Sequence, residues 1–139
     1  MTDILVSKDD GQVVTLTLND APANCLTMEM MSAIKMEIDR VSKSKDHKLV
    51  IFESSNEKIF CSGHSFNEVQ EMIKNNDKKS QELLFAECSE MLMKIRTSPK
   101  IFVAKVRGIA TAGGLGLVSI MDCVFSSKSA RFALGGINF

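Results

Sequence analysis

Two glycine-containing stretches decide the fold of this chain: residues 60–68 read FCSGHSFNE, and residues 108–117 read GIATAGGLGL. Each places glycine between an apolar stretch that favours a strand and a stretch that can begin a helix. Such a junction leaves backbone N–H groups without partners and directs them outward at the positive end of the helix dipole. Two such junctions that face each other can hold a developing oxyanion between two N–H donors.

The pattern around these stretches predicts an α/β fold in one domain that covers residues 1–139. Short apolar or β-branched runs indicate strands at residues 12–18, 48–53, 101–106, 123–126 and 131–134. Helices are expected from Thr27, where one face would carry apolar side chains, at residues 65–75 and 81–95, and from Gly113 or Gly114 toward Ile120. Strands that alternate with helices favour a sheet with crossover connections.

Two helix starts carry capping residues. Thr27 precedes the first helical pattern and is a candidate N-cap. Ser65 followed by Glu68 fits the capping box, in which the serine side chain accepts a hydrogen bond from the third residue of the helix. We therefore interpret Glu68 as a capping residue rather than a catalytic base.

Composition excludes several classes of partner. The chain has 17 basic and 17 acidic residues and no basic stripe, which argues against binding to nucleic acid. No apolar run reaches the roughly 20 residues that span a bilayer, so no membrane partner is expected. The N-terminal residues lack a basic segment followed by an apolar one, and we therefore expect no signal peptide and a cytoplasmic location.

The cysteines indicate reduced thiols rather than a metal site. Cys25, Cys61, Cys88 and Cys123 are widely spaced, and only two histidines are available as further ligands. We expect no bound metal. Cys61 lies near a helix start, where a thiol pKa can be lowered, but a small packed residue is the preferred interpretation.

Two other glycine-rich motifs fit poorly. A dinucleotide fingerprint needs a third glycine and a later acidic residue, and neither follows Gly114 and Gly116 at the required spacing. A phosphate-binding P-loop needs Lys-Ser/Thr after its second glycine, whereas Gly114 and Leu115 follow Gly113. The oxyanion interpretation needs only small residues at the donors.

The two stretches together resemble the signature of the enoyl-CoA hydratase/isomerase (crotonase) family, and the chain looks like the N-terminal portion of such a protein. The resemblance implies a spiral of ββα units, assembled as a homotrimer or a dimer of trimers. It also implies an acyl-CoA thioester as ligand, with coenzyme A as part of the substrate and no separate cofactor, and a place in fatty acid metabolism.

The resemblance assigns roles to individual residues. The oxyanion donors would be the backbone N–H groups of His64 and Gly113. The segment that lies along coenzyme A in the family resembles Ala23 and Asn24 here. Further substrate-binding positions would be Cys61, Ser62, Gly63 and Gly114. The imidazole of His64 is a lesser candidate for acid–base chemistry, because the family uses the backbone of this residue.

The departures from the family concern proton transfer. Family hydratases carry two glutamates, and the matching positions are Gly116 and Gly136. Glycine supplies neither the base nor the acid that hydration needs. The sequence therefore resembles a hydratase-domain-containing subgroup that lacks both glutamates. We expect an enzyme, a lyase or isomerase that stabilises a thioester enolate; the alternatives are a non-catalytic acyl-CoA-binding protein and an assembly subunit.

Overall fold

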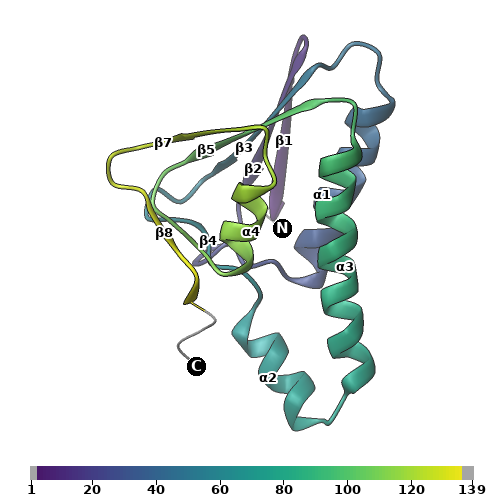
Figure 1. Ribbon diagram of the computed structural model, residues 1–139, viewed down its shortest axis with the longest axis vertical. Helices are drawn as coiled ribbons and strands as arrows, with labels where there is room; N and C mark the ends of the chain where they lie inside the picture. Colours follow the sequence, from purple (N-terminus) through teal and green to yellow (C-terminus); the bar gives the residue numbers. More distant parts are fainter. Residues whose placement is uncertain (1–2, 136–139) are drawn as a thin grey trace.

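The computed structural model describes residues 3–135, which form two sheets with the longer helices along one flank (Figure 1). The strands are β1 (Leu5–Asp10), β2 (Val13–Leu18), β3 (Leu49–Ser54), β4 (Ile59–Cys61), β5 (Ile101–Val106), β6 (Ile109–Thr111), β7 (Cys123–Ser126) and β8 (Arg131–Ala133). The helices are α1 (Met28–Lys43), α2 (Phe66–Lys74), α3 (Lys78–Thr97) and α4 (Gly113–Ser119).

The strands form two sheets. The larger sheet has the order β1-β2-β3-β5-β7, and the smaller sheet has the order β4-β6-β8. Among the strands of residues 3–135, β1 and β2 pair antiparallel and the other pairs are parallel. After the β1–β2 hairpin, which lies in the large sheet, each strand pair (β3 and β4, β5 and β6, β7 and β8) places its first strand in the large sheet and its second in the small sheet. This confirms the α/β class and the predicted spiral of ββα units.

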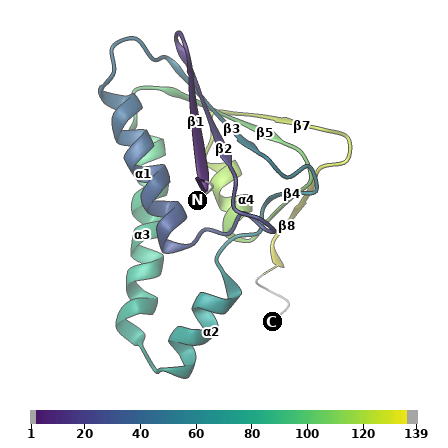
Figure 2. The ribbon, with the colours of Figure 1, turned by 180° about the vertical axis from the view of Figure 1, so that it is seen from behind.

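Helices α1 and α3 lie side by side, and α2 lies beside the lower part of α3, beyond the end of α1 (Figures 1 and 2). Alternate residues of β2 and β3 are fully buried, as expected for strands with one face on the core. Helix α1 buries an apolar stripe of Met30, Met31, Ile34, Ile38 and Val41. Helix α3 buries Leu84, Met91 and Ile95, whereas Cys88 on the same face is half-buried.

The predicted helix starts are confirmed at both caps. The Thr27 side chain accepts a hydrogen bond from the N–H of Met30 at 3.0 Å. The Ser65 hydroxyl accepts one from the N–H of Glu68 at 3.4 Å. Helix α4 begins at Gly113, as predicted.

Four elements differ from the predicted ranges, and one of them is β4, a three-residue strand just before Ser62 that no predicted strand range covers. The sequence pattern does not predict strand β1, because most of its side chains are exposed and it is an edge strand held by its pairing with β2. Strand β6 lies inside the glycine-rich stretch that we interpreted as a loop. Helix α3 begins three residues early, since Asp77 is its N-cap and accepts a hydrogen bond from the N–H of Ser80 at 3.0 Å. Within residues 3–135, no helix is long and apolar enough to cross a bilayer.

Candidate functional site

Parallel pairing in the small sheet brings the two glycine loops together. Strands β4 and β6 are neighbours, with Cys61 opposite Ala110 in the register. The loop before α2 leaves the end of β4, and the turn before α4 leaves the same end of β6. Because parallel strands end at the same edge of a sheet, the two loops emerge side by side.

The backbones of the two loops are in contact through their glycines. A Cβ atom placed on Gly63 would lie 2.8 Å from the backbone nitrogen of Gly113, and one placed on Gly113 would lie 3.4 Å from the Cα of Gly63. Gly63 also has a φ of +90°, in the left-handed region that disfavours side chains. Any larger residue at position 63 would push the loops apart.

Two backbone N–H groups at this contact have no acceptor. Within residues 3–135, neither the N–H of His64 nor that of Gly113 donates a hydrogen bond. Gly113 follows Ala112, whose φ of 50° and ψ of −124° are rare for a residue with a side chain. The N–H of Ala112 donates to the carbonyl of Ala133 at 3.0 Å, which anchors this sharp turn to β8. Strained backbone of this kind gathers at functional sites.

The segment that precedes α1 runs alongside the first loop. The N–H of Leu26 donates to the carbonyl of Gly63 at 2.8 Å, and the N–H of Ser62 donates to the carbonyl of Ala23 at 3.1 Å. These bonds hold the predicted coenzyme A segment, Ala23 and Asn24, against the predicted oxyanion loop. The structure therefore brings together residues that are far apart in the sequence.

The buried side chain of Asn24 anchors this segment through hydrogen bonds. Its side chain is 1% exposed, with a backbone φ of 48°. The amide nitrogen donates to the Ser54 hydroxyl at 2.8 Å and to the Phe60 carbonyl at 3.2 Å. The amide oxygen accepts from the N–H of Asp20 at 2.7 Å. Because the Asn24 side chain is occupied by these hydrogen bonds within the protein, a ligand at this position would contact the backbone of residue 24.

Cys61 is a packed residue, as preferred from the sequence. It is fully buried, and burial raises the pKa of its thiol to about 12. A lowered pKa at the helix start, the alternative that the sequence left open, is wrong because desolvation outweighs the hydrogen bond from the Gly63 backbone. The neighbouring Ser62 is half-buried, and its hydroxyl lies 3.3 Å from the Cys25 sulfur. Substrate contacts at Cys61 and Ser62 stay predictions.

Gly114 and Gly116 differ sharply in their surroundings. A Cβ on Gly114 would lie 2.2 Å from the Cys61 carbonyl oxygen, so this glycine permits α4 to approach β4. A Cβ on Gly116 would meet nothing within 4 Å. Position 116, one of the two that match the family glutamates, therefore faces open space without a carboxylate. The other, Gly136, lies outside the described residues.

Glu68 caps less than the sequence predicts. Its backbone N–H bonds Ser65, but one carboxylate oxygen is buried with no hydrogen-bond partner among residues 3–135. Desolvation raises the pKa of this carboxyl, against the opposing effects of the Met28 backbone and of His64. Glu68 is thus a titratable group held between two helix starts, beside the His64 side chain.

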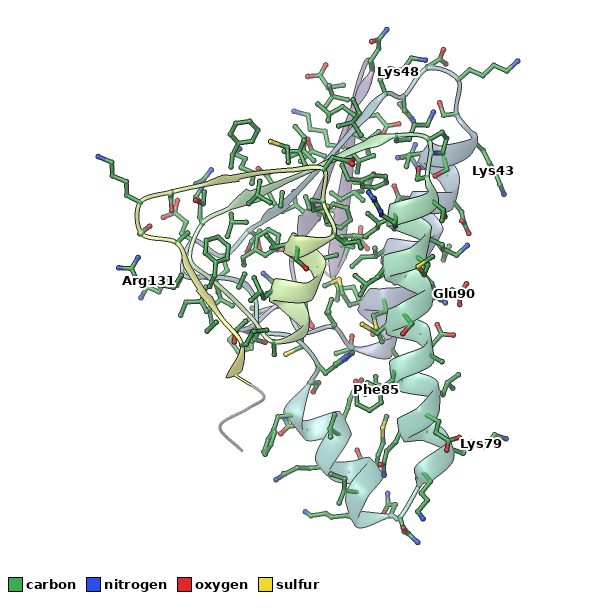
Figure 3. All side chains as sticks on the ribbon, viewed as in Figure 1. Lys43, Lys48, Lys79, Phe85, Glu90 and Arg131 are labelled. Carbon is green, nitrogen blue, oxygen red and sulfur yellow. The ribbon has the colours of Figure 1, made fainter. Side chains whose placement is uncertain are left out.

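The His64 side chain is fixed by two neighbours that the sequence did not point to. Its Nδ1 lies 3.2 Å from the Leu26 carbonyl oxygen. The ring of Phe85 packs edge-on against the imidazole, with ring centroids 5.6 Å apart. Figure 3 shows Phe85 projecting from α3 toward α2 and α4. No sequence signal could have found Phe85, since it lies off the buried stripe of its helix and is 57% exposed.

The surface carries several shallow hollows away from the contact between Gly63 and Gly113. They lie along α2, at Asn67, Gln70 and Lys74, and beside Gly108 and Arg131. Within the described part of the chain, no three side chains of the metal-binding types gather into a site. The polar groups that this region offers include the unpaired backbone N–H groups, the His64 ring and the Glu68 carboxyl.

Comparison with protein families and curated proteins gives a consistent result. The profile of the family described as enoyl-CoA hydratase/isomerase matches residues 8–139. The rat protein named enoyl-CoA hydratase domain-containing protein 3, mitochondrial, is 31% identical over 131 residues, which are 94% of this chain and 42% of that protein. The human protein of the same name is 31% identical over 129 residues, 93% of this chain and 41% of its own length.

Solved structures share the fold. The enoyl-CoA hydratase of Mycobacterium smegmatis superposes with a TM-score of 0.90 at 34% identity, covering 99% of this chain and 52% of that one. The human enoyl-CoA hydratase domain-containing protein 3 superposes with a TM-score of 0.90 at 26% identity, covering 98% and 53%. The chain thus spans about half the length of these relatives.

Proposed function

Because this chain belongs to the enoyl-CoA hydratase/isomerase family, we propose that it binds an acyl-CoA thioester and stabilises the oxyanion or enolate form of the thioester carbonyl. The donors are the backbone N–H groups of His64 and Gly113. The substrate is the thioester itself, and no separate cofactor is needed. The protein acts as a lyase or isomerase in the cytoplasm.

The observation that carries this proposal is the contact between the two glycine loops. Gly63 and Gly113 touch through their backbones, and the N–H groups of His64 and Gly113 are unpaired within residues 3–135. A preorganised donor costs no reorganisation when charge develops on the oxygen, and one such donor contributes about 2.7–4 kcal/mol to a transition state.

Hydration by the family's two glutamates is not part of the proposal. Position 116 holds glycine where the family has a glutamate, and a Cβ atom there would meet nothing within 4 Å. That observation favours a second candidate, a non-catalytic acyl-CoA-binding or assembly subunit on the same fold. Members of this fold usually form oligomers, and a homotrimer or dimer of trimers is our specific proposal for this protein.

Calorimetric titration tests the binding proposal. We expect butyryl-CoA to bind saturably and more tightly than free coenzyme A, because only the thioester offers a carbonyl to the two N–H groups. Equal affinities for both ligands would contradict an oxyanion site, and no binding at all would remove the acyl-CoA assignment.

A pair of variants isolates the donor. Gly113→Pro removes the N–H, and proline is tolerated at the first position of a helix. Gly113→Ala keeps the N–H and adds a methyl 3.3 Å from Leu26 Cδ1. The preference for thioester over free coenzyme A should disappear in Gly113→Pro and persist in Gly113→Ala. Circular dichroism of both variants verifies that they are folded.

A further inference from the structure

We propose that the imidazole of His64, through Nε2, is the base that removes a proton from the α-carbon of the bound thioester and later returns it. This inference rests on the proposed function and deepens it, because it supplies the proton-transfer group that Gly116 cannot provide. The same residue would then serve twice, with its backbone N–H on the oxygen and its side chain on the carbon.

The first step of the argument is the tautomer. Nδ1 lies 3.2 Å from the carbonyl oxygen of Leu26, which can only accept a hydrogen bond. In the neutral ring, Nδ1 therefore carries the hydrogen and Nε2 carries the lone pair. A histidine held in this way is ready to accept a proton at Nε2.

The second step is the position of the ring. A Cβ on Gly113 would lie 3.7 Å from Cδ2 of His64, the carbon bonded to Nε2. The edge of the imidazole that bears Nε2 thus lies beside the glycine whose N–H faces the proposed oxyanion. When the carbonyl oxygen of the thioester lies between the two N–H groups, the α-carbon is bonded to the carbonyl carbon. The α-carbon then lies about one imidazole width from that oxygen, which is near the edge of the ring that bears Nε2.

The third step is access. His64 is half-buried, and Nε2 has no hydrogen-bond partner within residues 3–135 and is not among the enclosed polar atoms there. The Phe85 ring packs against the imidazole and limits its rotation, while Phe85 itself is largely exposed. The ring is held in place from one side and open on the other.

The carboxyl group of Glu68 lies near the ring, and one of its oxygens is buried with no hydrogen-bond partner within residues 3–135. In this scheme Glu68 is a neighbour of the base and has no proton-transfer step of its own.

The electron balance of the step is complete within the enzyme and its ligand. The Nε2 lone pair bonds the α-proton, and the C–H electron pair forms a double bond between the α-carbon and the carbonyl carbon. The carbonyl π electrons move to oxygen, where the N–H groups of His64 and Gly113 hold the charge. Return of a proton from Nε2 to the α-carbon regenerates the thioester, with no oxidant or co-reactant.

The test is exchange of the α-protons of butyryl-CoA in D₂O, followed by mass spectrometry. His64→Asn keeps the backbone N–H and a side-chain donor for Leu26 but lacks the base. We expect its affinity for butyryl-CoA to stay within about threefold of wild type while exchange falls at least about 100-fold. His47→Asn is the matched control, since His47 pairs with Asp9 far from the loops and its loss should leave exchange unchanged.

A second variant keeps the test decisive if asparagine impairs folding. Imidazole added to His64→Ala should restore exchange, which a purely structural role for the ring would not allow. Wild-type exchange in His64→Asn, or binding of butyryl-CoA by wild type without any exchange, would overturn the inference but leave the binding proposal standing. Failure of wild type to bind butyryl-CoA would overturn both, and calorimetry detects it separately.

Discussion

Gly114 of α4 lies directly against the backbone of Cys61 at the end of β4, so close that a methyl group on Gly114 would come within 2.2 Å of the Cys61 carbonyl oxygen. This close contact determines the position of α4 against the small sheet. It also fixes where the preceding residue, Gly113, presents its N–H beside Gly63.

Gly114→Ala should therefore unfold the site or the protein. The clash is with backbone, which cannot move aside as a flexible side chain can, and we expect a loss of at least about 3 kcal/mol in the free energy of unfolding. Gly116→Ala is the matched control in the same helix, where an added Cβ meets nothing within 4 Å. It should stabilise the protein by about 0.5–1 kcal/mol. Urea denaturation of the two variants measures both effects.

Asn24→Ala should destabilise the segment that precedes α1. It leaves the Asp20 N–H and the Phe60 carbonyl without their partner, which costs about 1–3 kcal/mol. Alanine is also strained at the φ of 48° found here. Asn24→Gly loses the same hydrogen bonds without that strain, and should retain more stability than Asn24→Ala in urea denaturation. The reverse order would mean that the left-handed backbone at position 24 is not a constraint.

The stability contributed by Glu68 should depend on pH. Its pKa in the folded protein lies above 4.5, mainly because of desolvation. The folded state therefore holds this proton more tightly than the unfolded state. The favourable contribution is fully present below about pH 4.5 and is lost as the pH rises through the folded pKa.

Glu68→Gln abolishes this titration. The urea midpoint of the variant relative to wild type should be higher at pH 7 than at pH 4. Glu71→Gln, an exposed glutamate on the same helix, is the control and should show a smaller change between the two pH values. A relative midpoint for Glu68→Gln that does not change with pH would show that the carboxyl is not desolvated.

Alkylation should separate the thiols by burial. Cys123 is exposed, whereas Cys61 is fully buried with a pKa raised to about 12. At pH 8 the Cys61 thiolate is scarce, so iodoacetamide should modify it at least about 100-fold more slowly than free cysteine. Peptide mapping should show Cys123 modified first and Cys61 only after urea unfolds the chain. Rapid labelling of Cys61 in the folded protein would contradict its burial.

The helix starts and the α/β class could be predicted because their signals are local. Thr27 and Ser65 mark caps that need only the next three residues, and the apolar stripe of α1 repeats at helical spacing. Strand β1 carries no such signal, since exposed polar residues form it only by pairing with β2. Strand β6 is three residues long and is concealed by the glycines that follow it.

The candidate site divides in the same way. The glycines at positions 63 and 113 could be identified because close backbone approach requires them wherever the loops meet. The partners of the His64 ring could not, because Leu26 and Phe85 reach it only after the helices have packed. The pKa of Cys61 was likewise a question of burial, which the helix start alone does not determine.

The pairing of β4 with β6 sets the distance between the two loops that follow those strands. Neighbouring strands lie about 4.8 Å apart in any sheet, whatever side chains they carry. Since the His64 and Gly113 N–H groups follow β4 and β6, their separation is inherited from this repeat and from the glycines that let the loops touch. Side-chain changes around the loops can thus alter the surroundings of the two N–H groups without changing the distance between them.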